Sequence, residues 1–304
     1  MARVVFLGTP ESAVPALGAV TERHEVGLVI TQPDRPKGRS RKIQPPAVKI
    51  RANELGLEIA QPTTRSELYE ALHRVAPFDL GVVVAYGRIL RPEILSLAGH
   101  GLINVHFSLL PRWRGAAPVA RALMAGDAMT GVTIIKLDEG LDTGPVLTAQ
   151  AVDIAAHENA GTLTNRLSIM GARLLVSSIG PYLAGELVPT PQTDEGVTYA
   201  DKIGPSDRPI DTSSSVLAVT NQVRGLAPTP AATLTIDGET HKVYDVAPAD
   251  ASPPQGLCKT INGVPVVGVA DGGIQIRMLQ PPGKRPMSGA DWVRGRRTGQ
   301  GTLT

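Results

Sequence analysis

Cysteine is nearly absent from this sequence, and the single residue, Cys258, excludes an internal disulfide framework and any metal site built on several thiolates. Long hydrophobic runs are missing as well. The longest, at residues 80–87, is far shorter than the roughly 20 residues that a membrane helix needs. The N-terminal apolar stretch stops at Gly8-Thr9-Pro10, too early for a signal peptide. These absences predict a cytoplasmic globular protein that does not enter a membrane.

Net charge is also small, at +2 over 304 residues, and it points to no partner by itself. The basic residues are nevertheless clustered. Residues 35–42 hold five basic side chains and no acid, and residues 277–304 hold six basic side chains against Asp291 alone. A basic run is either a solvated face or a surface for nucleic acid, and composition leaves both open.

The first part of the chain alternates short β-branched runs with segments of helical pattern. Apolar strands separated by helices are typical of a parallel sheet covered on both faces. We therefore predict an α/β, Rossmann-like parallel-sheet domain over residues 1–184, closed by a helix over Ala160–Leu183. Its strands are expected at residues 3–7, 26–31, 79–86, 101–106 and 131–137.

The pattern changes after this domain. Residues 185–203 contain prolines and acids without a sustained period, which predicts a linker. Short strands with hairpin signals such as Asp237-Gly238 then follow, and they predict a small OB-type β-barrel domain over residues 204–304. Its strands are expected at residues 231–236, 241–246, 264–269 and 274–279.

Nucleotide-binding motifs are not convincing. Gly8-Thr9-Pro10 follows the first strand, but the later glycines of a dinucleotide fingerprint are missing and no Walker loop occurs. A tight turn from strand to helix is the favoured interpretation, so neither NAD nor ATP chemistry is expected.

Two polar side chains, Asn104 and His106, lie two residues apart at the carboxyl end of an expected strand. Alternation in a strand puts both on the same face, at the edge where open α/β sheets bind ligands. An amide and an imidazole there could donate hydrogen bonds to a developing oxyanion. A lone histidine in a strand is more often a core residue, so this pair alone does not decide the function.

Three acids, Asp138, Glu139 and Asp142, lie in a glycine-punctuated loop after the next expected strand. Such a loop is either a solvated turn or a cation site. The spacing matches no EF-hand, so the solvated turn is favoured and no metal is expected.

An ordered string of motifs connects these segments. NVHFSLLP at residues 104–111 is followed by RWRGAAP at 112–118 and LDTG at 141–144. Together with the stretches named next, these motifs resemble the 10-formyltetrahydrofolate-dependent formyltransferases over essentially the whole chain, especially the members that formylate methionyl-initiator tRNA. The further stretches are FLGTPE at 6–11, TQPDRPKGR at 31–39, VVVAYGRIL at 82–90, VTYADKI at 197–203 and LQPPGKRPMSGADW at 279–292.

The resemblance implies catalytic roles for Asn104, His106 and Asp142. Asn104 and His106 would stabilise the oxyanion, and Asp142 would accept the proton of the attacking amine and hold the His106 ring. A carboxylate beside the imidazole is expected to raise the pKa of His106. The formyl donor is 10-formyltetrahydrofolate, with its pterin near residues 88–90 and no metal required. It is expected beside four consecutive residues, Ser108, Leu109, Leu110 and Pro111.

The resemblance implies that the basic loop at residues 35–42 contacts the acceptor end of initiator tRNA, with Arg39 at the position that probes the first base pair. Its glycine, serine and prolines predict an extended, mobile conformation. The expected partner is thus methionyl-initiator tRNA, bound by a monomer. The cations concerned are Arg35, Lys37, Arg39, Arg41 and Lys42.

Two positions depart from the family pattern. Phe107 stands where many relatives have glycine or proline, on the expected folate side, and Thr212 stands where relatives often have tryptophan, at an expected contact between the domains.

The site motifs alone leave other acceptors open: water, glycinamide ribonucleotide or an amino-sugar nucleotide. A tRNA-binding protein without catalytic activity is a further alternative. The basic loop, the segment at 112–118 and the barrel favour tRNA, because a small acceptor needs no basic surface.

Overall fold

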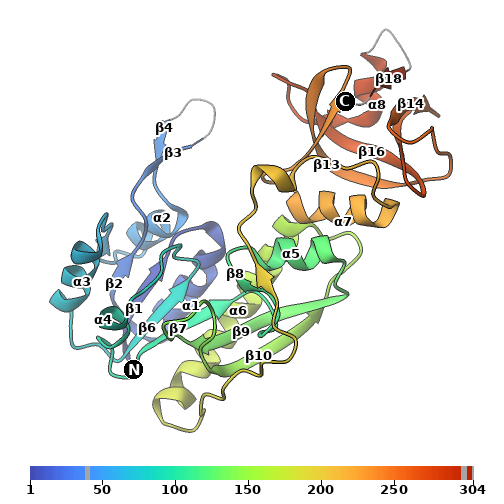
Figure 1. Cartoon of the computed structure of the whole chain (residues 1–304). Helices are drawn as coiled ribbons and strands as arrows, with labels where there is room; N and C mark the ends of the chain where they lie inside the picture. Colours follow the sequence, from blue (N-terminus) through green and yellow to red (C-terminus); the bar gives the residue numbers. More distant parts are fainter. Residues whose placement is uncertain (38–41, 296–299, 303–304) are drawn as a thin grey trace. The chain divides into compact units, whose positions relative to one another are not determined.

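The computed structural model describes residues 1–37, 42–295 and 300–302 (Figure 1). The chain divides into two compact units, each with its own seven-stranded sheet. The first unit comprises Met1–Pro118, Met129–Asp153 and Thr164–Ala200, and the second comprises Val119–Ala128, Ile154–Leu163 and Asp201–Thr304.

The sheet of the first unit has, in spatial order, the strands β10 (Val146–Asp153), β9 (Met129–Lys136), β7 (Leu102–His106), β6 (Leu80–Val84), β1 (Arg3–Gly8), β2 (Glu25–Ile30) and β5 (Ile59–Ala60). The strands from β7 to β5 run parallel, which confirms the α/β class. β9 is antiparallel to β7, and β10 is antiparallel to β9, so the sheet is parallel except at this edge. The cause is that β10 pairs directly back on β9, and it exposes much of its length as an antiparallel edge strand can.

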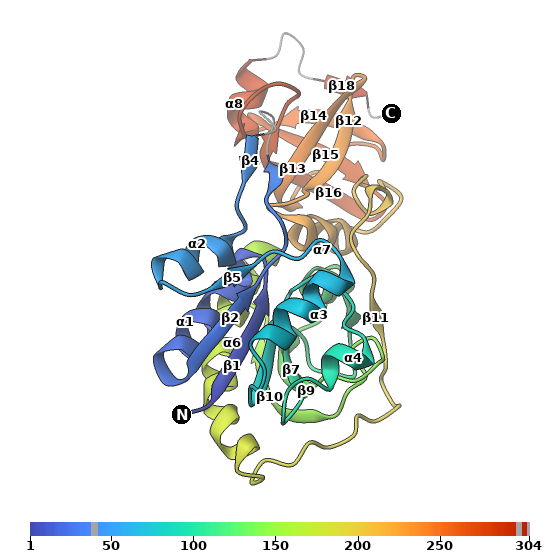
Figure 2. The same ribbon diagram turned by 90° about the vertical axis from the view of Figure 1, so that its left-hand side faces the viewer.

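Helices cover both faces of this sheet (Figure 2). One face carries α1 (Val14–Arg23), α2 (Ala47–Glu54) and α6 (Ala160–Leu183), and the other carries α3 (Arg65–Arg74) and α4 (Pro92–Leu95). A short 3-10 turn, η1 (Glu11–Ala13), precedes α1. Val5 and Leu7 of β1 are buried in one cluster with Leu68 of α3. Val4 and Phe6, which point to the opposite face, are buried as well. Burial on both faces explains why the strand sequences are almost entirely apolar.

Parallel pairing brings the carboxyl ends of β6 and β7 together, because Val83 pairs with Asn104. The loops that leave these ends are therefore neighbours. This edge of the sheet is the expected position of a ligand site.

Residues 35–44 form an antiparallel hairpin of β3 (Arg35–Lys37) and β4 (Lys42–Gln44), with Lys37 opposite Lys42. Figure 1 shows the hairpin standing out from the sheet of its unit. The sequence predicted an extended chain but not this pairing, because neither strand alternates apolar and polar residues. We term residues 35–44 the basic arm. Arg39 and Arg41 lie outside the described residues.

The predicted linker lies against the first unit for much of its length. Thr190 bridges to Val146, and β11 (Tyr199–Ala200) pairs in parallel with β8 (Arg114–Gly115). Gly115 has φ +125°, and a Cβ there would lie 2.8 Å from the carbonyl oxygen of Ala200, so the close approach requires glycine.

The second unit contains an antiparallel sheet of β12 (Ala232–Ile236), β13 (Glu239–Ala249), β16 (Gly272–Gln280), β15 (Val264–Val269), β14 (Leu257–Ile261) and β18 (Gln300–Thr302), with β17 (Met287–Ser288) paired to β16. The sheet curls as expected for an OB-like barrel. Asp237-Gly238 forms the predicted hairpin turn, with φ of +51° and +77°.

Helices α5 (Pro118–Ala125), α7 (Val216–Leu226) and α8 (Gly289–Arg294) and the turn η2 (Pro205–Asp207) complete the second unit. Val219 and Val223 of α7 are buried in the core of this sheet. Arg224 donates to the carbonyl oxygens of Ala155 and Glu158, which ties the segment Ile154–Leu163 to α7.

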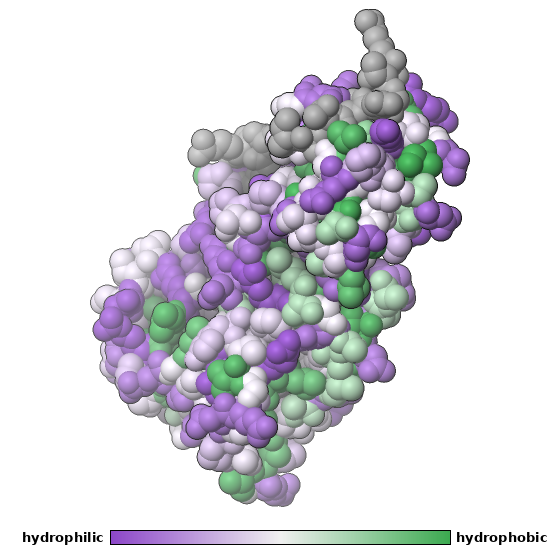
Figure 3. Space-filling view, turned by 45° about the vertical axis from the view of Figure 1, so that its right-hand side comes forward, coloured by the Kyte–Doolittle hydropathy of each residue, from purple (hydrophilic) through white to green (hydrophobic). Residues whose placement is uncertain are grey.

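On the face drawn in Figure 3, hydrophobic residues form separate patches among hydrophilic ones. The longest described helix, α6, has 24 residues. Within the parts of the chain that the structure describes, no helix is both long and apolar enough to cross a membrane.

Candidate active site

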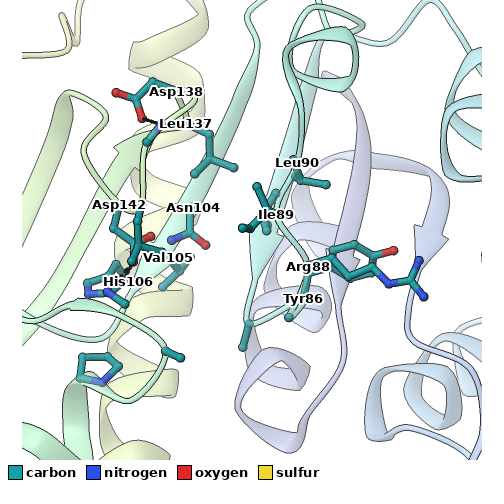
Figure 4. A pocket seen from close by; sticks show the side chains of 18 of the residues that line it. Tyr86, Arg88, Ile89, Leu90, Asn104, Val105, His106, Leu137, Asp138 and Asp142 are labelled. Atoms are coloured by element: carbon teal, nitrogen blue, oxygen red, sulfur yellow. Dashed lines mark hydrogen bonds and ion pairs between the residues drawn. The ribbon is translucent and has the colours of Figure 1, made fainter. Parts of the chain in front are cut away.

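A cavity of about 510 Å³ opens at the carboxyl edge of the first unit's sheet. One wall is the loop after β6, with Tyr86, Arg88 and Ile89, and the other is formed by β7 and the β9–β10 loop (Figure 4). The lining is mainly apolar with a few polar groups, which is typical of a site for a small organic ligand.

Asn104 and His106 both line this cavity from β7, as their spacing predicted (Figure 4). The Asn104 amide is partly buried and makes no hydrogen bond to any residue that the structure describes. It is therefore available to a ligand. The His106 side chain is only 5% exposed.

Asp142 reaches the site from the β9–β10 loop. Its Oδ2 lies 3.6 Å from Nδ1 of His106 and accepts a hydrogen bond of 2.8 Å from the backbone N–H of Gly115. Asp142 has φ +54°, in the left-handed region that few residues other than glycine adopt and in which aspartate is enriched. The structure thus brings together the three residues to which the sequence assigned catalysis.

The other two acids of the loop have different surroundings. Asp138 accepts hydrogen bonds from the backbone N–H of Gly140 and the hydroxyl of Thr143, so it supports the turn, and Glu139 is exposed. Among the described residues, no group of three or more His, Cys, Asp or Glu side chains could hold a metal ion.

Hydrogen bonding decides which ring nitrogen of His106 carries its proton. Nε2 lies 2.9 Å from the carbonyl oxygen of Trp113, which can only accept, so Nε2–H is the donor. Burial lowers the pKa of His106 below its ordinary value, and it outweighs the Asp142 carboxylate and the Trp113 carbonyl, which both raise it. The expected net increase in this pKa is therefore wrong. His106 is neutral at pH 7, with an unprotonated Nδ1 toward Asp142.

Trp113 and Gly115 were not predicted as functional residues, although the RWRGAAP motif contains them. Both contribute backbone groups, which leave no side-chain signal in a sequence. The N–H of Trp113 donates to the hydroxyl oxygen of Thr198 at 2.8 Å, which fixes the carbonyl that holds His106.

The candidate folate residues separate into two groups. Arg88, Ile89 and Leu90 line the cavity, whereas none of its described lining residues comes from 108–111. Ser108 is fully buried, its hydroxyl donates to the carbonyl of Arg112, and its own carbonyl accepts from Thr133. Leu109, Leu110 and Pro111 follow it outside the cavity lining.

The basic arm is exposed at Arg35, Lys42 and Ile43, and a described contact holds its root. Lys49 donates to both carboxylate oxygens of Asp34, at 2.8 and 2.9 Å. These bonds, with one from Gln61, keep the pKa of Asp34 below its ordinary value. Lys37 belongs to β3.

Two family models match the chain: formyl transferase over residues 2–179 and the formyl transferase C-terminal domain over residues 202–297. The chain therefore belongs to the formyl transferase family. Relatives that match over almost their full length are named methionyl-tRNA formyltransferases. The methionyl-tRNA formyltransferase of Halorhodospira halophila is 46% identical over 302 residues, which cover 97% of each chain. That of Jannaschia sp. is 41% identical over 304 residues, which cover 99% of each. The resemblance found in the sequence is confirmed.

Solved structures share the fold. The N-formyltransferase from Helicobacter canadensis, in complex with folinic acid and dTDP-3-aminofucose, has a TM-score of 0.70 at 18% identity and covers 92% of this chain and 100% of that one. HypX from Aquifex aeolicus, in complex with tetrahydrofolic acid, has a TM-score of 0.67 at 16% identity and covers 100% of this chain and 51% of that one. At these identities the likeness concerns the fold alone.

Proposed function

We propose that this protein transfers the formyl group of 10-formyltetrahydrofolate to the α-amino group of methionyl-initiator tRNA and so supplies formylmethionyl-tRNA for translation initiation. The observation that carries the proposal is the convergence of Asn104, His106 and Asp142 on one cavity. It occurs in a chain whose full-length relatives are named methionyl-tRNA formyltransferases.

The cavity fits the donor. Its volume of about 510 Å³ and its apolar lining suit a heteroaromatic ring, with Arg88 among the few polar groups beside it. 10-Formyltetrahydrofolate supplies the activated formyl group. Residues 88–90 are proposed to contact the pterin. The segment of Ser108, Leu109, Leu110 and Pro111 is proposed to lie beside the bound folate, outside the part of the site that the cavity lining describes.

Asn104 is proposed to donate its unused amide N–H to the formyl oxygen as negative charge develops there. A fixed donor of this kind lowers the barrier, because it requires no reorganisation during the reaction. Asn104 projects into the cavity beside His106, so both can face one reacting carbon (Figure 4).

Asp142 and His106 are proposed to move one proton. The pair takes it from the amine as the new C–N bond forms, with Nδ1 of His106 able to hold it opposite the Asp142 carboxylate. The pair then returns the proton to N10 of the folate as the old C–N bond breaks. In the interval the N–H at Nδ1 can donate to the oxyanion, because Nε2–H remains on the carbonyl oxygen of Trp113. Atoms and charges balance in this scheme without a metal.

Each part of the chain has a role in this proposal. Residues 1–184 bind folate and catalyse, residues 185–203 connect, and residues 204–304 bind tRNA. The basic arm, with Arg35, Lys37, Arg39, Arg41 and Lys42, meets the acceptor end of the tRNA as phosphate-binding charge. The protein acts as a cytoplasmic monomer away from membranes.

The test is a comparison of acceptors. Purified protein is incubated with 10-formyltetrahydrofolate and, separately, initiator methionyl-tRNA, elongator methionyl-tRNA, glycinamide ribonucleotide, an amino-sugar nucleotide or water alone. We expect rapid formylation of initiator methionyl-tRNA only. Formate release without an acceptor, or formylation of a small amine, would show that the protein catalyses a different reaction of the formyl donor. Binding of tRNA without turnover would favour a purely tRNA-binding protein.

A further inference from the structure

The side chain of Gln192 lies between the β9–β10 loop, which carries Asp142, and the short strand β8, although it comes from the segment predicted as a linker. Its Nε2 donates to the carbonyl oxygens of Asp142 and Gly144, both at 2.8 Å. Its Oε1 accepts two hydrogen bonds from the guanidinium of Arg114, at 3.1 and 2.8 Å. The side-chain amide of Gln192 thus joins the β9–β10 loop to β8 with four hydrogen bonds.

The loop that Gln192 holds has little freedom. Asp142 keeps a left-handed φ of +54°, a conformation that is uncommon outside glycine, asparagine and aspartate. At Gly144 a Cβ would lie 1.8 Å from the carbonyl oxygen of Lys136, so the backbone there is pressed against β9. The hydrogen bonds from Gln192 fall on these two residues, one on either side of Thr143.

The other side of the contact is equally fixed. The Arg114 side chain is buried, and the next residue, Gly115, donates its backbone N–H to Oδ2 of Asp142. Gln192 therefore ties the Asp142 backbone to the same two-residue strand that binds the Asp142 carboxylate. The resulting ring of contacts sets the separation of 3.6 Å between Oδ2 of Asp142 and Nδ1 of His106. That distance is longer than a hydrogen bond, so a small shift of the loop changes the proton transfer proposed for this pair.

We infer that Gln192 is a positioning residue for Asp142, and that the segment between the two predicted domains thereby takes part in catalysis. The inference rests on the catalytic role proposed for Asp142. Gln192 needs no contact with either substrate for this role. It acts by holding the carboxylate beside the imidazole, so that the two groups can move the proton of the amine together.

Substitutions at Gln192 separate its two functions as donor and acceptor. Gln192→Ala removes both, and a misplacement of this kind is expected to slow single-turnover formyl transfer by roughly 10- to 100-fold. Binding of tetrahydrofolate and of methionyl-tRNA should stay within about twofold, because positioning acts on the chemical step. Gln192→Glu keeps the acceptor for Arg114 but lacks both donors to the loop, so it should be at least as slow as Gln192→Ala. Wild-type activity in Gln192→Glu would overturn the inference.

Gln150→Ala is the matched control, because Gln150 is an exposed glutamine of β10 outside the site. It should transfer formyl groups at the wild-type rate. Thermal unfolding is measured for every variant, and Gln192→Met, which keeps the side-chain volume, replaces Gln192→Ala if that variant does not fold. A Met variant as active as wild type would likewise contradict the inference.

A double-mutant cycle with Asp142→Asn tests the proposed connection directly. If Gln192 acts through Asp142, then Gln192→Ala should change the residual rate of Asp142→Asn by less than about twofold. Effects that multiply would show that Gln192 acts elsewhere, and the inference would be wrong while the proposed function stood. Full activity of Asp142→Asn itself would instead remove the catalytic role of Asp142 and, with it, the reason to position that residue.

Discussion

The active site and the basic arm of the first unit differ in how firmly their side chains are held. In the active site, His106 is 5% exposed and bonded to a backbone carbonyl, and Asp142 is held by Gly115 and Gln192. On the arm, Arg35 and Lys42 are exposed, and a described salt bridge lies only at the root, between Asp34 and Lys49. Formyl transfer needs donors and a base in fixed positions away from water, whereas a charged polymer is bound by accessible cations. This difference fits the proposed division of roles, with chemistry in the first region and acceptor recognition in the second.

The largest effect is expected from His106→Ala. Loss of the imidazole removes the site of proton transfer and a donor to the oxyanion, and one such donor is typically worth roughly 10²–10³ in rate. Single-turnover formyl transfer should fall by about this factor, with methionyl-tRNA binding unchanged. A rate within about threefold of wild type would show that the chemistry lies elsewhere.

Asp142→Asn should be nearly as damaging and should preserve the shape of the site. The amide can still accept from the N–H of Gly115, but it cannot take the amine's proton or stabilise a protonated His106. The informative measurement is the single-turnover rate of the variant beside that of His106→Ala. A rate within about threefold of wild type would show that the Asp142 carboxylate takes no part in the proton transfer.

On the basic arm, smaller and more selective effects are expected. Arg41→Ala with Lys42→Ala should weaken binding of both initiator and elongator methionyl-tRNA. It should also reduce the salt slope of binding by about 1 for each phosphate that the arm no longer neutralises. Binding of tetrahydrofolate should stay at its wild-type value. Lys42 is exposed, and an exposed substitution usually changes stability by no more than about 0.5 kcal/mol. An unchanged salt slope would show that the arm is solvated and does not bind tRNA phosphates.

The smallest effect concerns stability. Burial lowers the pKa of His106 from 6.5, so the unfolded chain binds this proton at a higher pH than the folded one. Folding free energy attributable to His106 is therefore fully present above pH 6.5 and is lost as the pH falls below it, down to the folded pKa. Denaturant unfolding at pH 7.5 and 5.5 should show a greater loss in wild type than in His106→Ala. Equal losses would contradict the burial of a neutral ring.

Much of the fold was predictable because its strands are apolar and its long helix is periodic. The helix at Ala160–Leu183 has the predicted bounds, and β15 also coincides with its predicted range. α7 was missed, although Ser215 caps it by accepting from the N–H of Ala218. Its valines and threonine disfavour a helix in isolation, and packing of Val219 and Val223 on the sheet overrides that preference.

The catalytic residues of the site could be predicted from side-chain spacing and from the family resemblance. Strand alternation placed Asn104 and His106 on one face, and the family resemblance added Asp142. The contact of Gln192 with Asp142 spans 50 residues of sequence, and no local pattern reports it. The sign of the His106 pKa shift was missed for a related reason: the sequence shows the neighbouring carboxylate but not the burial that outweighs it.

The separation of chemistry from recognition is tested most directly by assaying His106→Ala and Arg39→Ala side by side on initiator and elongator methionyl-tRNA. Arg39 lies outside the described residues, and its guanidinium could contact a base edge as well as phosphate. We expect His106→Ala to lower both rates and leave their ratio unchanged, and Arg39→Ala to bring the two rates closer together while tetrahydrofolate binds as tightly as before. An unchanged ratio in Arg39→Ala, or an altered ratio in His106→Ala, would contradict the division of roles between the arm and the active site.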